Sequence, residues 1–206
     1  MSNAIKEMTM SKTHTYTLKA YPKEIKLRDK SAVTLKPMTQ ADDKALLDFF
    51  RRIPADERYY LKDDGSKPEV IERWTADLDY DRTLPLLAWA NGKVVADATL
   101  HRTRANARRH VGQLRVVVDP SYRDKGLGTL LLRELVAISN ENGLDRVMLD
   151  IISEKEEAAR KAAEAIGFVQ AGRLPGHAKD LDGHPRDILL LEMPLGKWLE
   201  WWDPQF

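Results

Sequence analysis

The chain of 206 residues carries 33 lysines and arginines against 32 aspartates and glutamates, so its formal net charge is +1 and no chain-wide field attracts nucleic acid. The absence of cysteine excludes disulfides, thiolate nucleophiles and thiolate metal sites, and it fits a cytoplasmic location. No apolar run approaches the roughly 18 residues of a membrane span, and the N-terminus lacks the apolar core of a signal peptide, so no membrane partner is expected.

The composition, 43% hydrophobic and 32% charged, is typical of a globular protein, and the sequence contains no repeat and no low-complexity linker. We therefore expect one domain over residues 21–196. A flexible segment is expected at 1–20, where Ser2-Asn3-Ala4 resembles a tag remnant, and an aromatic tail at 197–206.

Hydrophobic periodicity and turn residues divide the domain into strands and helices. Asn91-Gly92 between two β-type runs is the strongest hairpin signal. Thr39 and Ser153 are expected to be helix N-caps, and Gly143 to end a helix. In chain order, the predicted elements are strands at 23–27 and 32–37, helices at 40–52 and 68–78, strands at 84–90, 93–103 and 109–118, a helix at 126–142, a strand at 144–152, a helix at 153–168, and strands at 168–174 and 187–195.

The turn between residues 118 and 127 joins a strand that ends in three valines to a leucine-rich helix. Its sequence RDKGLG places two glycines at the first helical amides, which have no partner inside the helix and carry the positive end of the helix dipole. A phosphate or pyrophosphate suits such a turn, with Arg123 and Lys125 as nearby cations. The alternative is that the glycines only allow the helix to pack closely on the strand.

Two other phosphate-binding motifs do not fit this turn. A P-loop ends in Gly-Lys followed by Ser or Thr, which this turn lacks. The dinucleotide fingerprint needs a third glycine, where this chain has Leu131. A dinucleotide-binding oxidoreductase is therefore the weaker interpretation.

The longer pattern, three valines followed by Asp119-Pro120 and Arg123-Asp124-Lys125-Gly126-Leu127-Gly128, resembles the acyl-CoA-binding core of the GNAT superfamily of N-acetyltransferases, with its motif [QR]-x-x-G-x-[GA]. Ile166-Gly167-Phe168 is similar to the Gly-Phe that ends the family's last core helix. The resemblance covers residues 31–195. It implies an α/β (α+β) GNAT-like fold: a central, mostly antiparallel sheet that is splayed after the fourth core strand, with helices on both faces and an extra N-terminal hairpin.

The same resemblance implies an N-acetyltransferase that moves an acetyl group from acetyl-CoA to an amine by direct attack in a ternary complex, without a metal. The acceptor would be a small molecule or a protein lysine. The amide of Val116 would polarise the thioester carbonyl, and Val116, Val117 and Val118 would line the pantetheine arm on a strand that carries a bulge. The residues implied for the pyrophosphate are Arg123, Asp124, Lys125, Gly126, Leu127, Gly128 and Thr129.

The chain departs from many members of the family on the last core helix. Where these have an asparagine and a tyrosine that serves as general acid, this sequence has Glu156 and Ala163. The tyrosine's role is therefore not transferred. A catalytically inactive acyl-CoA-binding regulatory module is the alternative function.

The general base is left open by the sequence. His110, near the start of the strand at 109–118, and His101, in the strand before it, could take a proton from the amine, although a solvated histidine is the plainer reading of each. Glu154, Glu156 and Glu157 could face the acceptor, but the helix dipole also explains three acids at a helix start.

Three further clusters have structural explanations. His177 and His184 flank aspartates whose turn positions explain them better than a metal does. The family resemblance implies that this hairpin forms a wall of the acceptor pocket. The arginines at 102, 104, 108 and 109 are read as a solvated loop. The stripe of Trp198, Trp201 and Trp202 predicts a packed C-terminal segment or a homodimer contact.

Overall fold

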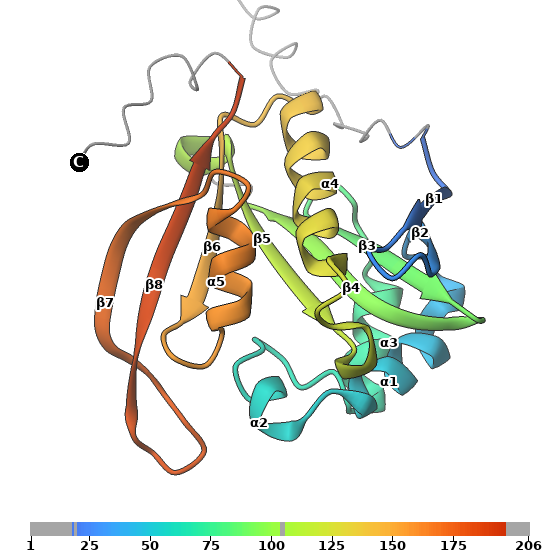
Figure 1. The fold of residues 1–206 in the computed structure, drawn as a ribbon, viewed down its shortest axis with the longest axis horizontal. Coiled ribbons are helices and arrows are strands. Elements are labelled where there is room, and N and C mark those ends of the chain that lie inside the picture. The colour runs from blue at the N-terminus through green and yellow to red at the C-terminus, as the bar shows by residue number, and fades with distance from the viewer. Residues whose placement is uncertain (1–17, 19, 104–105, 197–206) are drawn as a thin grey trace, which may run out of the picture.

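The structure, a computed structural model, describes residues 18, 20–103 and 106–196. Its strands form one eight-stranded sheet in the order β1-β2-β3-β4-β5-β6-β8-β7 (Figure 1). Every neighbouring pair is antiparallel except β5 and β6. The strands are β1 (Lys23–Lys26), β2 (Ala32–Pro37), β3 (Thr83–Ala90), β4 (Lys93–Arg102), β5 (Val111–Val118), β6 (Arg146–Ile152), β7 (Val169–Lys179) and β8 (Pro185–Pro194). The helices are α1 (Asp43–Arg52), α2 (Ala55–Arg58), α3 (Pro68–Ala76), α4 (Leu127–Glu141) and α5 (Glu157–Glu164).

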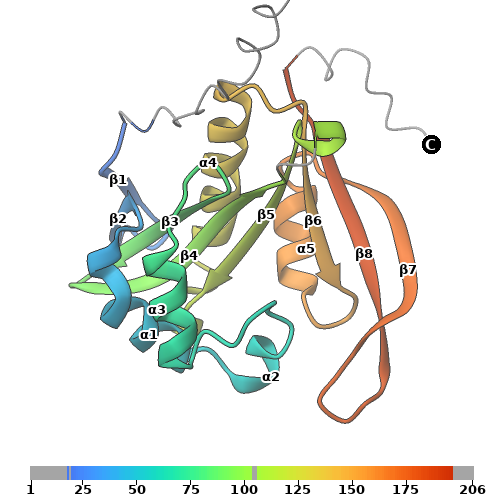
Figure 2. The ribbon, with the colours of Figure 1, turned by 180° about the vertical axis from the view of Figure 1, so that it is seen from behind.

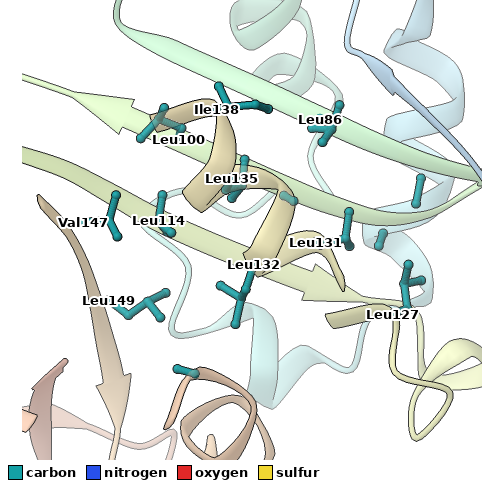
Figure 3. Packing of buried hydrophobic residues seen from close by; sticks show 14 of the residues in the cluster. Leu86, Leu100, Leu114, Leu127, Leu131, Leu132, Leu135, Ile138, Val147 and Leu149 are labelled. Atoms are coloured by element: carbon teal, nitrogen blue, oxygen red, sulfur yellow. The ribbon is translucent and has the colours of Figure 1, made fainter. Parts of the chain in front are cut away.

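Helices cover both faces of the sheet, as expected. α4 and α5 lie on one face, and α1 and α3 lie on the other (Figures 1 and 2). The leucine stripe of α4 packs on the central strands, where Leu131 and Leu135 are fully buried and Leu135 lies near Leu114 of β5 (Figure 3). On the far face, Phe49 and Phe50 of α1 form a second buried cluster. Within the described residues, no helix has the length and apolar character of a membrane span.

The sheet opens between β5 and β6, which confirms the expected splay. The two strands pair only at Val111↔Arg146, Gly112↔Val147 and Gln113↔Met148, and then diverge (Figure 1). The expected bulge is wrong for this strand, because β4 and β5 keep one continuous register from Arg102↔Gly112 to Ala96↔Val118. The opening therefore arises from β6 leaving the sheet rather than from a defect in β5. A register irregularity occurs instead in the neighbouring strand pair, β3 and β4, at Ala88/Trp89.

The predicted helix boundaries need two corrections. Ser153 is not an N-cap, since its amide donates to the carbonyl of Asp187 (N–O 2.9 Å) and α5 begins only at Glu157. Glu154 adopts a positive φ of 68°, which breaks the helical path in between. Thr39 precedes a short 3₁₀ turn (Gln40–Asp42) rather than α1 itself.

The remaining elements agree with the sequence or extend it. α4 covers the predicted helix to within one residue at each end. α2 was not predicted: it is a single turn directly after Pro54. β7 and β8 run further than expected and meet in a tight turn at Asp180–His184, so the hairpin projects beyond the sheet (Figure 1). The segment 1–17, the arginine at 104 and the aromatic tail from 197 lie outside the described residues.

Candidate active site

The turn before α4 has the backbone geometry of an anion site. Gly126 is the N-cap residue and adopts a left-handed conformation with φ 84°. The first amide that bonds back into the helix is that of Leu130, which donates to the Gly126 carbonyl (3.1 Å). Within the described chain, the amides of Leu127, Gly128 and Thr129 donate to no backbone carbonyl, so they are available to a ligand at the positive end of the helix.

The two cations predicted beside this turn both contact carboxylates. Arg123 donates twice to Glu57 of α2 (2.8 and 2.6 Å) and also to the carbonyl of Val118 (3.2 Å). The ammonium of Lys125 pairs with Asp29 (3.0 Å) in the β1–β2 turn. Arg123 thus ties the helix α2 to the turn, and its charge is shared with a protein partner.

Arg28 is a third cation at the turn, and the sequence reasoning missed it. Its amide donates to the carbonyl of Lys125 (3.1 Å), which docks the β1–β2 turn onto residues 123–126. A Cβ built on Gly126 would lie only 3.0 Å from the Arg28 Nε, so the arginine crosses the bare face of the glycine. Among the described residues no hydrogen bond or ion pair engages its exposed guanidinium.

Backbone alternation along β5 decides which amides face the opening. The carbonyl of His110 accepts the amide of Asp145 (2.9 Å), so it faces β6. The amide of Asp119 donates to Val95 (2.9 Å), so it faces β4. Because a strand's polar groups point alternately to its two edges, the amide of Val116 faces the side of β6, where β6 has already diverged.

A cavity of about 320 Å³ lies on the opposite face of the sheet, beneath α1 and α3. Asp97, Thr99 and His101 line its floor from alternate positions of β4. Arg115 and Val117, the two residues that flank Val116, line it from β5. One strand, β5, therefore separates the cavity from the opening between β5 and β6.

The electrostatics of this floor are unusual. Burial raises the pKa of Asp97 from 3.8 to about 6, although the hydroxyl of Thr99 donates to it (3.0 Å) and the charge of Arg115 opposes the shift. Asp97 keeps a partly accessible surface toward the cavity. The pKa of His101 is lowered from 6.5 to about 4, first by burial and then by the charges of Lys62 and Arg115, so its ring is neutral at pH 7.

The helix α5 and the turn before it provide fewer candidate catalytic acids and bases than the sequence suggested. Ala163 is fully buried in the core, so this position provides no acid. Glu156 accepts the amide of Ile152 (2.7 Å), and burial raises the pKa of its carboxyl. Glu154 pairs with Arg186 (2.8 Å).

The remaining predicted candidates lie elsewhere. His110 is exposed and precedes Val116 by six positions, which is roughly 20 Å along an extended strand, too far for direct proton transfer at Val116.

Asp180, Asp182 and His184 gather with their ligand atoms within 4.8 Å of one another. One oxygen of Asp180 accepts the backbone amides of Asp182 (3.1 Å) and His184 (2.9 Å), and the other accepts Arg186 (2.8 Å). Both oxygens thus have structural partners, as the turn explanation expects.

Comparison with known proteins agrees with this architecture. The acetyltransferase of the GNAT family from Streptococcus pneumoniae has a TM-score of 0.69 at 25% identity, covering 79% of this chain and 99% of that chain. The yncA structure from Salmonella typhimurium, which holds its cofactor acetyl-CoA, has a TM-score of 0.68 at 19% identity, covering 80% and 95%. YwnH of Bacillus subtilis (strain 168), named as a candidate phosphinothricin acetyltransferase, is 24% identical over 160 residues, which are 77% of this chain and 97% of that protein. The chain belongs to the acetyltransferase (GNAT) family, whose model matches residues 47–168.

Proposed function

We propose that the protein transfers an acetyl group from acetyl-CoA to a primary amine, with the two substrates bound together. The observation that carries the proposal is the opening between β5 and β6, where the amide of Val116 faces a gap that ends at the bare helix N-terminus of α4. A pantetheine arm can bond to an unpaired strand edge, and a pyrophosphate suits the helix end. The presence of acetyl-CoA in the related yncA structure supports the same ligand here.

The turn residues have distinct roles in this proposal. The amides of Leu127, Gly128 and Thr129 bind the pyrophosphate, because they point out of the helix without internal partners. Arg28 adds a cation over Gly126. Within the part of the chain that the structure describes, its charge is not shared with a protein carboxylate, whereas Arg123 pairs with Glu57 and Lys125 pairs with Asp29. Val117 and Val118 complete the walls on either side of the strand.

The chemical step needs an uncharged amine and a donor for the developing oxyanion. The Val116 amide would supply the donor, and a single such donor typically contributes about 2.7–4 kcal/mol to the step. The leaving thiolate of coenzyme A is stable enough to depart without the tyrosine that Ala163 replaces. His110 is not part of the proposal because of its distance from Val116.

Thermal unfolding with acetyl-CoA, coenzyme A, NAD and ATP tests the ligand. At about a hundred times its dissociation constant, a specific ligand adds about 2.7 kcal/mol, or roughly 5–10 °C in the midpoint for a chain of this size. Acetyl-CoA and coenzyme A alone should give this shift. A shift with NAD or ATP only would refute the proposal, whereas acetyl-CoA binding without amine-dependent thiol release would favour the inactive binding module.

Two glycines of α4 provide a matched pair of variants. Gly126→Asp places a side chain and a negative charge at the proposed pyrophosphate site, and it should abolish the acetyl-CoA shift. Gly143→Asp makes the same change at the other end of α4, where the glycine also has a positive φ (71°) and a Cβ would meet no atom within 4 Å. It should keep the shift. Equal binding by the two folded variants would refute the site.

A further inference from the structure

The cavity beneath α1 and α3 combines a largely apolar wall with a carboxylate on its floor. Its volume of about 320 Å³ lies at the lower end of the range for small-molecule sites, roughly 300–1,000 Å³. Apolar side chains from α1, α3 and the adjoining loops form much of its wall: Met38, Leu46, Phe50, Leu61, Trp74 and Leu78. Its one carboxylate on the central strands is Asp97 of β4.

Asp97 lies close to the proposed reaction centre. Its Cα pairs with that of Val117, and the neighbouring Ala98 pairs with Val116. Paired residues of adjacent antiparallel strands are about 5 Å apart, so only the width of β5 separates this carboxyl from the edge that carries the Val116 amide. An amine that enters the cavity with its nitrogen toward β5 therefore passes Asp97 before it reaches the opening.

Resting on the proposed function, we propose that this cavity is the acceptor site, that its substrate is a small primary amine with an apolar body, and that Asp97 is the catalytic residue that binds the ammonium and takes its proton. The apolar walls hold the body of the amine, and the carboxylate holds its charged end. An ammonium beside this carboxylate would stabilise its charge, which is partly desolvated in the cavity. The hydroxyl of Thr99 positions the carboxyl from below by a hydrogen bond (3.0 Å).

With this assignment, every proton of the reaction is accounted for. The ammonium loses one proton to Asp97, directly or through one water, and its lone pair forms the new bond to the carbonyl carbon of the thioester. The carbon–sulfur bond breaks as the tetrahedral adduct collapses. The second proton leaves the nitrogen for the thiolate, which departs as the free thiol of coenzyme A, and Asp97 returns its proton to water.

The surroundings favour Asp97 over His101 as the base. A carboxyl whose pKa is raised to about 6 is ionised at pH 7 and is still more basic than an exposed aspartate, which suits proton transfer near neutral pH. His101 is paired with Gln113, three positions from Val116, and lies further from the opening. Arg115 of β5 also lines the cavity, and its charge lowers the pKa of Asp97 against the effect of burial. The other charged side chains that line the cavity are Lys62, Asp63, Arg73, Asp77, Asp79 and Arg82.

Asp97→Asn keeps the size of the side chain and removes its charge and basicity. With acetyl-CoA and 2-phenylethylamine or n-hexylamine, this variant should lose at least about a hundredfold in kcat/KM for the amine, the lower range for loss of a general base. Asp48→Asn is the matched control, because Asp48 is exposed on α1 and is not among the residues that line the cavity. It should stay within about threefold of the unsubstituted protein. Both variants should keep the acetyl-CoA thermal shift.

A binding measurement on the unsubstituted protein is independent of how the variant folds. At pH 7.5, 2-phenylethylamine should raise the unfolding midpoint in the presence of coenzyme A, and 2-phenylethanol, its neutral counterpart, should not. Equal shifts with the two compounds, or an Asp97→Asn variant within threefold, would overturn the role of Asp97. A protein that binds acetyl-CoA and acetylates a lysine-containing peptide but neither small amine would overturn the acceptor class and leave the proposed function intact. A protein that shows no acetyl-CoA shift refutes the proposed function itself.

Discussion

Replacing Asp97 by asparagine should make the stability of the protein less dependent on pH. A carboxyl whose pKa is higher in the folded than in the unfolded chain binds protons more tightly when folded. This carboxyl therefore lowers the free energy of unfolding as the pH rises through the window between its two pKa values. Asparagine does not titrate, so the variant loses this contribution while every other group titrates as before.

The two pKa values set the expected size of the effect. With 3.8 for the unfolded chain and about 6 for the folded one, the full shift corresponds to about 3 kcal/mol at neutral pH. Between pH 4.5 and 7.5, the difference in free energy of unfolding, Asp97→Asn minus unsubstituted, should rise by about 2 kcal/mol. Because the side chain of Asp97 is partly accessible to solvent, screening makes this figure an upper value.

Urea unfolding followed by tryptophan fluorescence and circular dichroism at both pH values measures this difference. The slope of the free energy against urea must be the same for the two proteins, so that a midpoint shift reports stability alone. A difference that stays constant with pH would show that Asp97 titrates like an exposed aspartate in a well-hydrated cavity. A difference that grows toward acid pH would reverse the sign and refute the burial of this charge.

Four other substitutions separate binding, chemistry and folding. Arg28→Ala should weaken coenzyme A binding by about tenfold in calorimetry, the effect of one charged contact, whereas Lys30→Ala in the same turn should not. Val116→Pro removes the amide that faces the opening and should lower kcat by about 10²–10³ in a thiol-release assay with acetyl-CoA affinity retained. Leu131→Ala should cost about 2–5 kcal/mol in urea unfolding because the side chain is fully buried. Tyr122→Phe should leave turnover unchanged, since this ring packs on the core beneath Lys125 (4.8 Å).

Local patterns in the sequence were sufficient to predict the turn before α4. The leucine stripe sets the helix, the glycines set its first amides, and the structure has Gly126 at the N-cap with a left-handed backbone. The opening between β5 and β6 was accessible only through the family resemblance, because it depends on how far a distant strand follows β5. Nothing in the local sequence of either strand states where their pairing ends.

Arg28 shows what local patterns cannot supply. In sequence it is one of several charged residues in a hairpin turn, and its position over Gly126 follows from the docking of that turn through the Arg28 amide and the Lys125 carbonyl. Asp97 did leave a signal, as an acid in the middle of the apolar strand VVADATL. A role for Asp97 could be inferred only once the cavity was known, because an aspartate on the α4 face of the same strand would lie in a closed core. His110 is a different case, because the length of the strand after it already indicates from the sequence that it lies far from Val116.

The arrangement of β5 explains how the two proposed substrates can meet without a covalent intermediate. A strand presents its backbone polar groups along its edges and its side chains on its faces. Neighbouring residues of one strand can therefore contact one ligand through the backbone and a second ligand through side chains. In the proposed arrangement, the open edge at Val116 would offer an amide to the thioester, and the face that carries Val117 and its paired residue Asp97 would hold the amine. Pairing with β4 in unbroken register keeps these two directions fixed relative to each other. The departure of β6, rather than any distortion of β5, is therefore what creates the site.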